Sequence, residues 1–136
     1  MNDIPTIRVG ILGFGTVGQG TWKHLQENSS FWEKILAVRL VPVRASVRNL
    51  NKERKVLIPM ESLTTDSNAI VDDPDIDVIC ELIGGIEEAK KLTLRAFSHG
   101  KSVVTANKAL ICEHGEELFN AAEKAGVHYA FEASVA

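Results

Sequence analysis

The chain has 136 residues, 45% of them hydrophobic and 24% charged, and its formal net charge is -3. That length suits one domain with a buried core. Its 15 lysines and arginines are offset by 18 aspartates and glutamates, so the composition gives no sign of a protein that binds nucleic acid or a membrane surface. The first ten residues lack the regions of a secretory signal, and no apolar run reaches the roughly 20 residues of a membrane span. We therefore expect a cytoplasmic protein, with Cys80 and Cys112 as reduced, structural thiols.

The first half of the chain predicts a strand, a helix and a second strand. Residues 7–12 form a short, almost continuously apolar run that is typical of a strand buried on both faces. Glycines end this run, and residues 16–27 then have the apolar stripe of a helix, which Asn-Ser-Ser breaks. Residues 37–45 predict the second strand, in which Pro42 indicates an edge or a bulge.

The second half repeats this alternation after a polar, basic loop over residues 49–60. Asp66 is a candidate N-cap of a short helix, and Gly100 and Gly126 are candidate C-terminal caps of two longer ones. The expected elements are strands at 62–65, 77–83, 101–105 and 127–132, and helices at 66–73, 87–99 and 113–125.

Strands that alternate with helices through the whole length predict β-α-β units and a parallel sheet covered on both faces. The expected fold class is therefore α/β, a doubly wound parallel sheet of the Rossmann dinucleotide-binding kind. No linker or repeat divides the chain, so we expect residues 1–136 to form one domain.

The sequence Gly13-Phe14-Gly15-Thr16-Val17-Gly18 matches G-x-G-x-x-G and stands between the first strand and the first helix, where a dinucleotide-binding turn belongs. Gly13 permits the tight turn, Gly15 permits the backbone to approach a pyrophosphate, and Gly18 permits the helix to pack on the strand. The free N–H groups of that helix favour an anion. The alternative is a glycine turn that binds no ligand.

The choice of coenzyme depends on the end of the second strand, where an NAD enzyme carries a carboxylate for the ribose hydroxyl. Residues 43–49 contain none, whereas Arg48 offers a planar fork to a 2'-phosphate and Lys52, Arg54 and Lys55 follow. These features favour NADP over NAD. A solvated basic loop is the alternative.

Three further segments give the sequence a family resemblance: Glu-Leu-Ile-Gly-Gly at 81–85, Thr-Ala-Asn-Lys-Ala-Leu at 105–110 and Phe-Glu-Ala-Ser-Val-Ala at 131–136. Together with the glycine turn, and in the same order, they closely resemble the coenzyme-binding half of homoserine dehydrogenase. The resemblance covers essentially the whole chain. It implies an NAD(P)-binding domain that stops before the catalytic and dimerisation domain, so we expect the 136 residues alone to be inactive.

The activity that the resemblance implies is reversible hydride transfer between NAD(P)H and aspartate 4-semialdehyde, which gives homoserine for threonine and methionine synthesis. Lys108 matches a lysine beside the nicotinamide and the reacting carbonyl, where an ammonium stabilises a developing alkoxide or gives it a proton. In similar enzymes a second lysine, in the following domain, is usually assigned the proton transfer, which would leave Lys108 an electrostatic role. The residues expected to bind coenzyme are Gly13, Phe14, Gly15, Thr16, Val17, Gly18, Arg48, Gly84, Thr105 and Lys108.

Glu132 and the carbonyl of Val135 match residues that hold a monovalent cation, such as sodium, in similar full-length enzymes, which are homo-oligomers. Two other functions remain open. A stand-alone dinucleotide-sensing module would bind coenzyme without catalysis. An aspartate-semialdehyde dehydrogenase would need a catalytic cysteine at a strand-to-helix junction, a context that Cys112 lacks.

Overall fold

The computed structural model describes residues 4–131 and contains strands and helices in near-regular alternation. In chain order the elements are β1 (Thr6–Leu12), α1 (Thr16–Glu27), α2 (Ser29–Leu36), β2 (Arg39–Ser46), the 3-10 turn η1 (Met60–Ser62), β3 (Leu63–Thr64), α3 (Ser67–Val71), β4 (Val78–Glu81), α4 (Glu87–Ser98), β5 (Ser102–Thr105), α5 (Lys108–Ala125) and β6 (Tyr129–Phe131).

The six strands form one sheet in the order β3-β2-β1-β4-β5-β6, and all five pairings are parallel. The chain moves outward from β1 in one direction, then returns to β4 and moves outward in the other. This reversal is the switch point of the Rossmann fold. The predicted doubly wound α/β fold is therefore confirmed.

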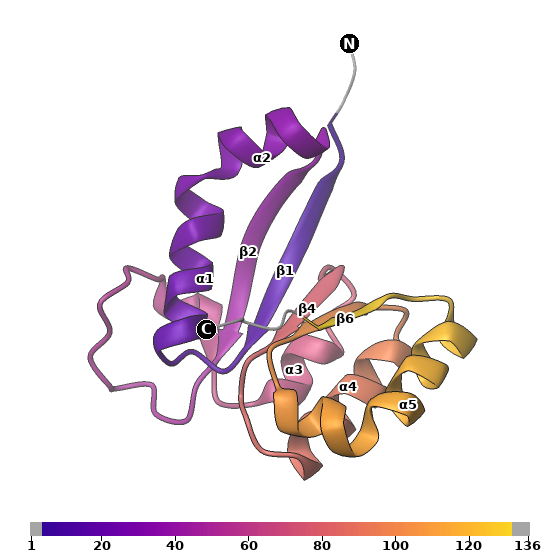
Figure 1. Cartoon of the computed structure of the whole chain (residues 1–136). Coiled ribbons are helices and arrows are strands. Elements are labelled where there is room, and N and C mark those ends of the chain that lie inside the picture. The colour runs from indigo at the N-terminus through magenta and orange to yellow at the C-terminus, as the bar shows by residue number, and fades with distance from the viewer. Residues whose placement is uncertain (1–3, 132–136) are drawn as a thin grey trace.

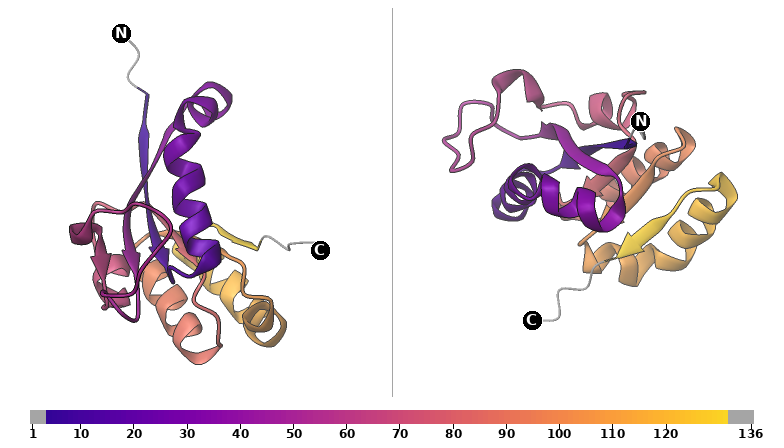
Figure 2. Two further views of the ribbon diagram at one scale, coloured as in Figure 1. Left: turned by 90° about the vertical axis from the view of Figure 1, so that its left-hand side faces the viewer. Right: turned by 90° about the horizontal axis from the view of Figure 1, so that it is seen from above.

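Two separate cores cover the two faces of the sheet. On one face, Trp22 of α1 packs with Val9, Ile11 and Phe14. On the other, Ile70 of α3, Leu92 of α4 and Leu118 of α5 belong to the larger cluster. Figure 1 shows α1 beginning at the end of β1 and running back alongside the strands, and the two views of Figure 2 show α1 and α2 on the opposite side of the sheet from α4 and α5.

The structure differs from the sequence-based expectation at two helices. Helix α2 was not predicted, because Asn28-Ser29-Ser30 was interpreted as a break; Asn28 ends α1 and at once begins α2. Helix α5 begins at Lys108, five residues before the expected Glu113, because the side chain of Asn107 caps it by accepting a hydrogen bond from the Leu110 N–H. Lys108 therefore lies in the first turn of a helix.

The irregularity predicted at Pro42 is present as a bulge. Val9 pairs with Pro42, but the next residue, Gly10, pairs with Arg44, so Val43 is an extra residue in β2. Proline has no N–H to donate, and a bulge accommodates it in an interior strand.

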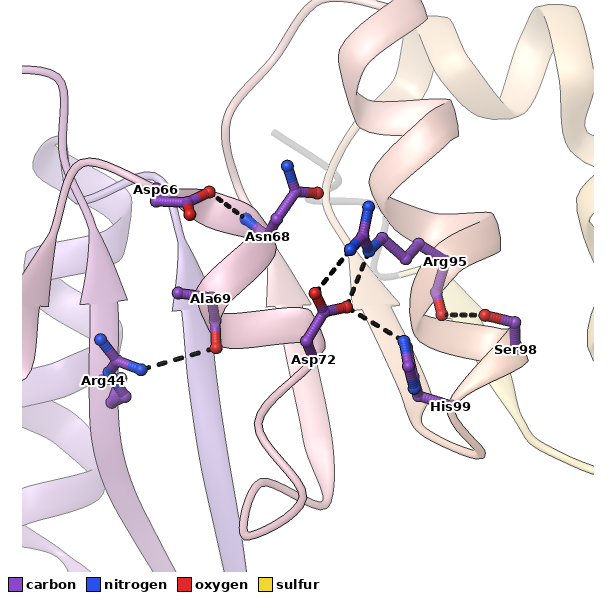
Figure 3. Close-up of polar contacts among 8 residues, drawn as sticks. All are labelled: Arg44, Asp66, Asn68, Ala69, Asp72, Arg95, Ser98 and His99. Carbon is purple, nitrogen blue, oxygen red and sulfur yellow. Dashed lines mark hydrogen bonds and ion pairs between the residues drawn. The ribbon is translucent and has the colours of Figure 1, made fainter.

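At the amino-terminal edge of the sheet, α3 is tied to α4 by charged side chains. Arg95 donates from Nε and Nη2 to the two carboxylate oxygens of Asp72, at 2.7 and 2.6 Å, and His99 Nε2 lies 3.0 Å from Asp72 Oδ1. Figure 3 shows this group at the end of α3, and Asp66 at the start of that helix, which it caps by accepting from the Asn68 N–H as predicted. The tie fixes α3 against α4 far from the glycine turn.

Candidate functional site

The last residues of β1, β2, β4 and β5 pair with one another across the sheet, so the segments that follow these strands lie at one edge. Leu12 pairs with Ser46 on one side and Glu81 on the other, and Glu81 pairs with Thr105. The glycine turn follows β1, the basic loop follows β2 and Lys108 follows β5. Because all these strands run the same way, the three segments lie at the same, carboxyl-terminal edge of the sheet, as expected.

Each glycine of the G-x-G-x-x-G turn meets a different requirement. Gly13 has φ 92°, and a Cβ there would lie 2.8 Å from the Leu82 carbonyl oxygen. A Cβ on Gly18 would overlap the Gly13 carbonyl oxygen, so this glycine lets α1 pack on the turn. A Cβ on Gly15 would meet no atom within 4 Å. The side of Gly15 is thus open, as the predicted approach of a pyrophosphate requires.

Buried side chains hold the glycine turn against the end of the sheet. Ser46 is 3% exposed, and its Oγ accepts a hydrogen bond of 3.0 Å from the Gly13 N–H. Phe14 is also buried, with its ring edge-on to Trp22 at 5.9 Å between centroids. Phe14 is one of the residues expected to bind coenzyme, and in the structure its ring packs in the core.

A groove of about 470 Å³ opens at this edge between the glycine turn, the end of β2 and the end of β4. Its lining is mixed polar and apolar. The lining residues are Gly13, Phe14, Gly15, Ser46, Val47, Arg48, Asn49, Lys52, Arg54, Thr65, Ser67, Leu82, Ile83 and Glu88.

Three cationic residues line the groove, Arg48 and, from the basic loop after it, Lys52 and Arg54, and they are not equivalent. Arg54 is half-buried and donates to the carbonyls of Asn49 and Lys52, at 2.5 and 2.8 Å, so its guanidinium shapes the loop. Arg48 and Lys52 are exposed, and the structure gives their side chains no partner among residues 4–131. Gln19 of α1 joins the same loop by accepting from the Lys55 N–H at 3.0 Å. The loop is therefore anchored while Arg48 faces solvent and the groove.

The remaining predicted coenzyme residues lie at the same edge but do not line the groove. Thr16 and Val17 are exposed in the first turn of α1, and Gly84, with φ 73°, begins the turn after β4. Lys108 is exposed at the start of α5. Thr105 is fully buried, so its side chain supports the edge from inside instead of contacting a ligand directly.

Sequence reasoning missed the buried carboxyl of Glu81. This residue ends β4 at 0% exposure and accepts hydrogen bonds from the Thr105 hydroxyl at 2.8 Å and the Ile83 N–H at 3.1 Å. Burial raises the pKa of the Glu81 carboxyl, and these hydrogen bonds oppose the rise. The available signal was a single acidic residue inside an otherwise apolar predicted strand.

The predicted cation ligands Glu132 and Val135 lie outside the described residues. Within residues 4–131, no cluster of three or more His, Cys, Asp or Glu side chains has the arrangement of a metal site. None of the helices in this part of the chain has the length and apolarity needed to cross a membrane.

Comparison with known proteins gives a consistent result. Residues 13–132 match the family model described as homoserine dehydrogenase, NAD binding domain. The chain is 46% identical over 130 residues to the homoserine dehydrogenase of Synechocystis sp. and 42% identical over 133 residues to that of Bacillus subtilis. These alignments cover 96% and 98% of this chain but 30% and 31% of the relatives.

The solved structures agree with the sequence relatives. The crystal structure of a homoserine dehydrogenase from Thiobacillus denitrificans superposes with a TM-score of 0.88 at 45% identity, over 93% of this chain and 29% of that one. These matches favour the dehydrogenase interpretation over a stand-alone sensor module. The chain spans about 30% of the length of the curated relatives that it matches, and it belongs to the family of homoserine dehydrogenase NAD-binding domains.

Proposed function

We propose that this chain is the coenzyme-binding part of an enzyme that interconverts aspartate 4-semialdehyde and homoserine with a nicotinamide coenzyme. The observation that carries the proposal is the groove at the carboxyl edge, where the open side of Gly15 and the exposed Arg48 face one space. Family membership supports the same activity.

The residues present fit a dinucleotide. The turn leaves room at Gly15. Gly15 is also the N-cap of α1, and because glycine has no side chain, no side-chain oxygen of the cap accepts from the first N–H groups of the helix. Those N–H groups and the positive end of the helix dipole are therefore free to hold a pyrophosphate. When bound, the nicotinamide supplies hydride to the aldehyde carbon or accepts it from the alcohol.

We assign NADP(H) as the preferred coenzyme. Residues 45–49, at the end of β2, carry no carboxylate for a ribose 2'-hydroxyl, and Arg48 and Lys52 supply two charges for a 2'-phosphate. Among the lining residues of the groove, Glu88 is acidic, but it comes from α4. NAD remains the alternative coenzyme.

The coenzyme assignment is tested by calorimetry with NADPH and NADH. Arg48→Ala should weaken NADPH binding by about 1.5 to 3 kcal/mol, roughly 10- to 150-fold, and leave NADH binding unchanged. Arg39→Ala is the matched control, because it removes the same charge at the other end of β2. Tighter binding of NADH than of NADPH by the unsubstituted chain would refute the assignment.

Lys108 is proposed to act on the reacting carbonyl. Its ammonium stands at the carboxyl-terminal edge of the sheet, where the coenzyme is proposed to bind and which we call the coenzyme edge. There it stabilises negative charge on the substrate oxygen as hydride adds to the carbon. In the full-length encoded protein, Lys108→Ala should lower kcat for aspartate semialdehyde by about 100-fold or more, as measured by nicotinamide absorbance. Binding of NADPH should persist in this variant. Lys91→Ala, an exposed lysine of α4, is the control. Full activity in Lys108→Ala would remove the residue from the mechanism.

The proposal extends to the other features of similar full-length enzymes: a homo-oligomeric, cytoplasmic protein in threonine and methionine synthesis, with a monovalent cation near Glu132 and Val135. Carboxylate and carbonyl oxygens suit such an ion. Replacing sodium by a large organic cation in the assay should lower activity, and Glu132→Gln should weaken the dependence on sodium. Activity independent of sodium would exclude this part.

A further inference from the structure

A chain of hydrogen bonds runs from the buried Glu81 to the helix that carries Lys108. The Thr105 hydroxyl donates to Glu81 Oε1 at 2.8 Å and accepts from the Asn107 N–H at 3.0 Å. Asn107 in turn accepts from the Leu110 N–H at 3.0 Å and donates from Nδ2 to the Gly85 carbonyl at 2.5 Å. Lys108 lies in the sequence between Asn107 and Leu110 and is the first residue of α5.

The second carboxylate oxygen of Glu81 holds the neighbouring segment. It accepts from the Ile83 N–H at 3.1 Å, just before Gly84 and Gly85. The two oxygens therefore fix the turn after β4 and the turn after β5, and Asn107 joins those turns a second time through Gly85. Both turns stand at the coenzyme edge.

The buried Glu81 carboxyl is an unfavourable way to hold two strands together if stability is its only role. Glu81 is fully buried, and the structure shows no ion pair between it and any cation of residues 4–131. Burying a carboxyl without a cation is unfavourable, and an apolar pair across two strands would hold them at lower cost. What an apolar pair does not supply is two directed acceptors, one for each turn.

We propose that Glu81 is a positioning residue, which acts through Thr105 and Asn107 to fix the place of Lys108 at the coenzyme edge. The inference rests on the proposed function of Lys108. Glu81 touches neither coenzyme nor substrate; it determines the geometry of a residue that does.

The first test uses the unsubstituted chain and needs no ligand. The amides of Asn107 and Leu110 should exchange with solvent much more slowly than those of Glu88 and Ala89, because α4 has no side-chain cap and α5 has one. Exchange of the two sets at similar rates would overturn the proposal.

The second test compares three threonine variants. Thr105→Val keeps shape and removes the hydroxyl, so Asn107 and Leu110 should exchange faster; Thr105→Ser should restore the slow exchange. Thr93→Val is the matched control, since Thr93 is equally buried and its hydroxyl has no hydrogen-bond partner in the described structure. In the full-length encoded protein, Thr105→Val and Glu81→Gln should lower kcat roughly 10- to 100-fold, with a much smaller change in coenzyme Kd.

The outcomes separate the two proposals. Unchanged kcat in both Thr105→Val and Glu81→Gln would overturn the positioning role, as would a loss of coenzyme affinity equal to the loss of kcat. If the unsubstituted encoded protein reduces no aspartate semialdehyde, the proposed function fails, and the exchange rates still decide whether Glu81 fixes the turn. Should Thr105→Val not fold, the rates in the unsubstituted chain and in Thr105→Ser remain decisive.

Discussion

The glycines of α1 and its preceding turn offer a test in which three similar substitutions have three different results. Gly15, Gly18 and Gly20 lie within six residues of one another, and each is replaced by alanine. A Cβ on Gly18 would overlap the carbonyl oxygen of Gly13, whereas one on Gly15 or Gly20 would meet no atom within 4 Å. None of the three has a positive φ. The results therefore depend on space and not on backbone strain.

Gly18→Ala should destabilise the fold. The overlapping atom is backbone, which does not move aside as a flexible side chain would, and overpacking of this kind costs about 1 to 3 kcal/mol. Gly20→Ala, two positions along the same helix, should stabilise it by about 0.5 to 1 kcal/mol through helix propensity. The free energies of unfolding of the two variants should therefore differ by roughly 1.5 to 4 kcal/mol. Urea unfolding measures this difference, provided that the m-value is the same for both variants.

Gly15→Ala should lower the free energy of unfolding by no more than about 1 kcal/mol, which is the cost of alanine as an N-cap, because its Cβ meets no atom within 4 Å. Its coenzyme affinity should fall at least about tenfold, since the methyl group occupies the space through which a pyrophosphate reaches the helix N–H groups. Gly20→Ala is the control for binding as well. Full NADPH affinity in Gly15→Ala, or a stable Gly18→Ala, would refute the assignment of the turn.

Two further predictions concern groups away from the groove. The Arg95 hydrogen bonds lower the pKa of Asp72 below its ordinary 3.8, so its stabilising effect is present above that pH and is lost as the pH falls through the lowered folded-state value. Asp72→Asn should therefore unfold more easily than the original at neutral pH, with the difference vanishing in strong acid; Asp75→Asn is the control, and a difference that persists at the acid end would contradict the linkage. Burial raises the pKa of Cys80 to about 11, whereas Cys112 is exposed, so a disulfide reagent at pH 8 should label one thiol quickly and the second only on unfolding. A fast phase that survives in Cys112→Ser would show that Cys80 is accessible.

Most of the fold follows from local signals in the sequence. Apolar runs predict most strands of the sheet, with glycines closely following those of β1 and β4, and Asp66 and Gly126 act as the caps that their residue types predict. Helix α2 was missed because Asn28-Ser29-Ser30 has the residue types of a break, whereas in the structure Asn28 ends α1 and begins α2. The apolar residues of α2 do lie on one side of the helix, so the break signal at residues 28–30, and not the lack of a helical pattern, caused the miss.

The site was predictable only where a residue acts through its own conformation or charge. The glycine turn and Arg48 are of that kind. Ser46 and Glu81 are not, because their roles consist of hydrogen bonds to partners 33 and 24 residues away in the sequence, which only the strand order brings together. The cysteine assignment was half correct for a similar reason: Cys112 stands among apolar residues in the sequence but on an exposed part of α5.

Strand order also relates the two ends of the proposed coenzyme site. Arg48 follows β2 and Lys108 follows β5, and three strand spacings separate these strands, about 14 Å in all. The glycine turn after β1 and the Ile83–Gly85 turn after β4 lie between them, on either side of the switch point. In the proposed site, an extended dinucleotide with its phosphorylated ribose at Arg48 would cross the glycine turn with its pyrophosphate and end near Lys108. On this geometry Arg48→Ala and Lys108→Ala act on opposite ends of one ligand, so their effects on NADPH affinity and on kcat should be independent and additive in free energy.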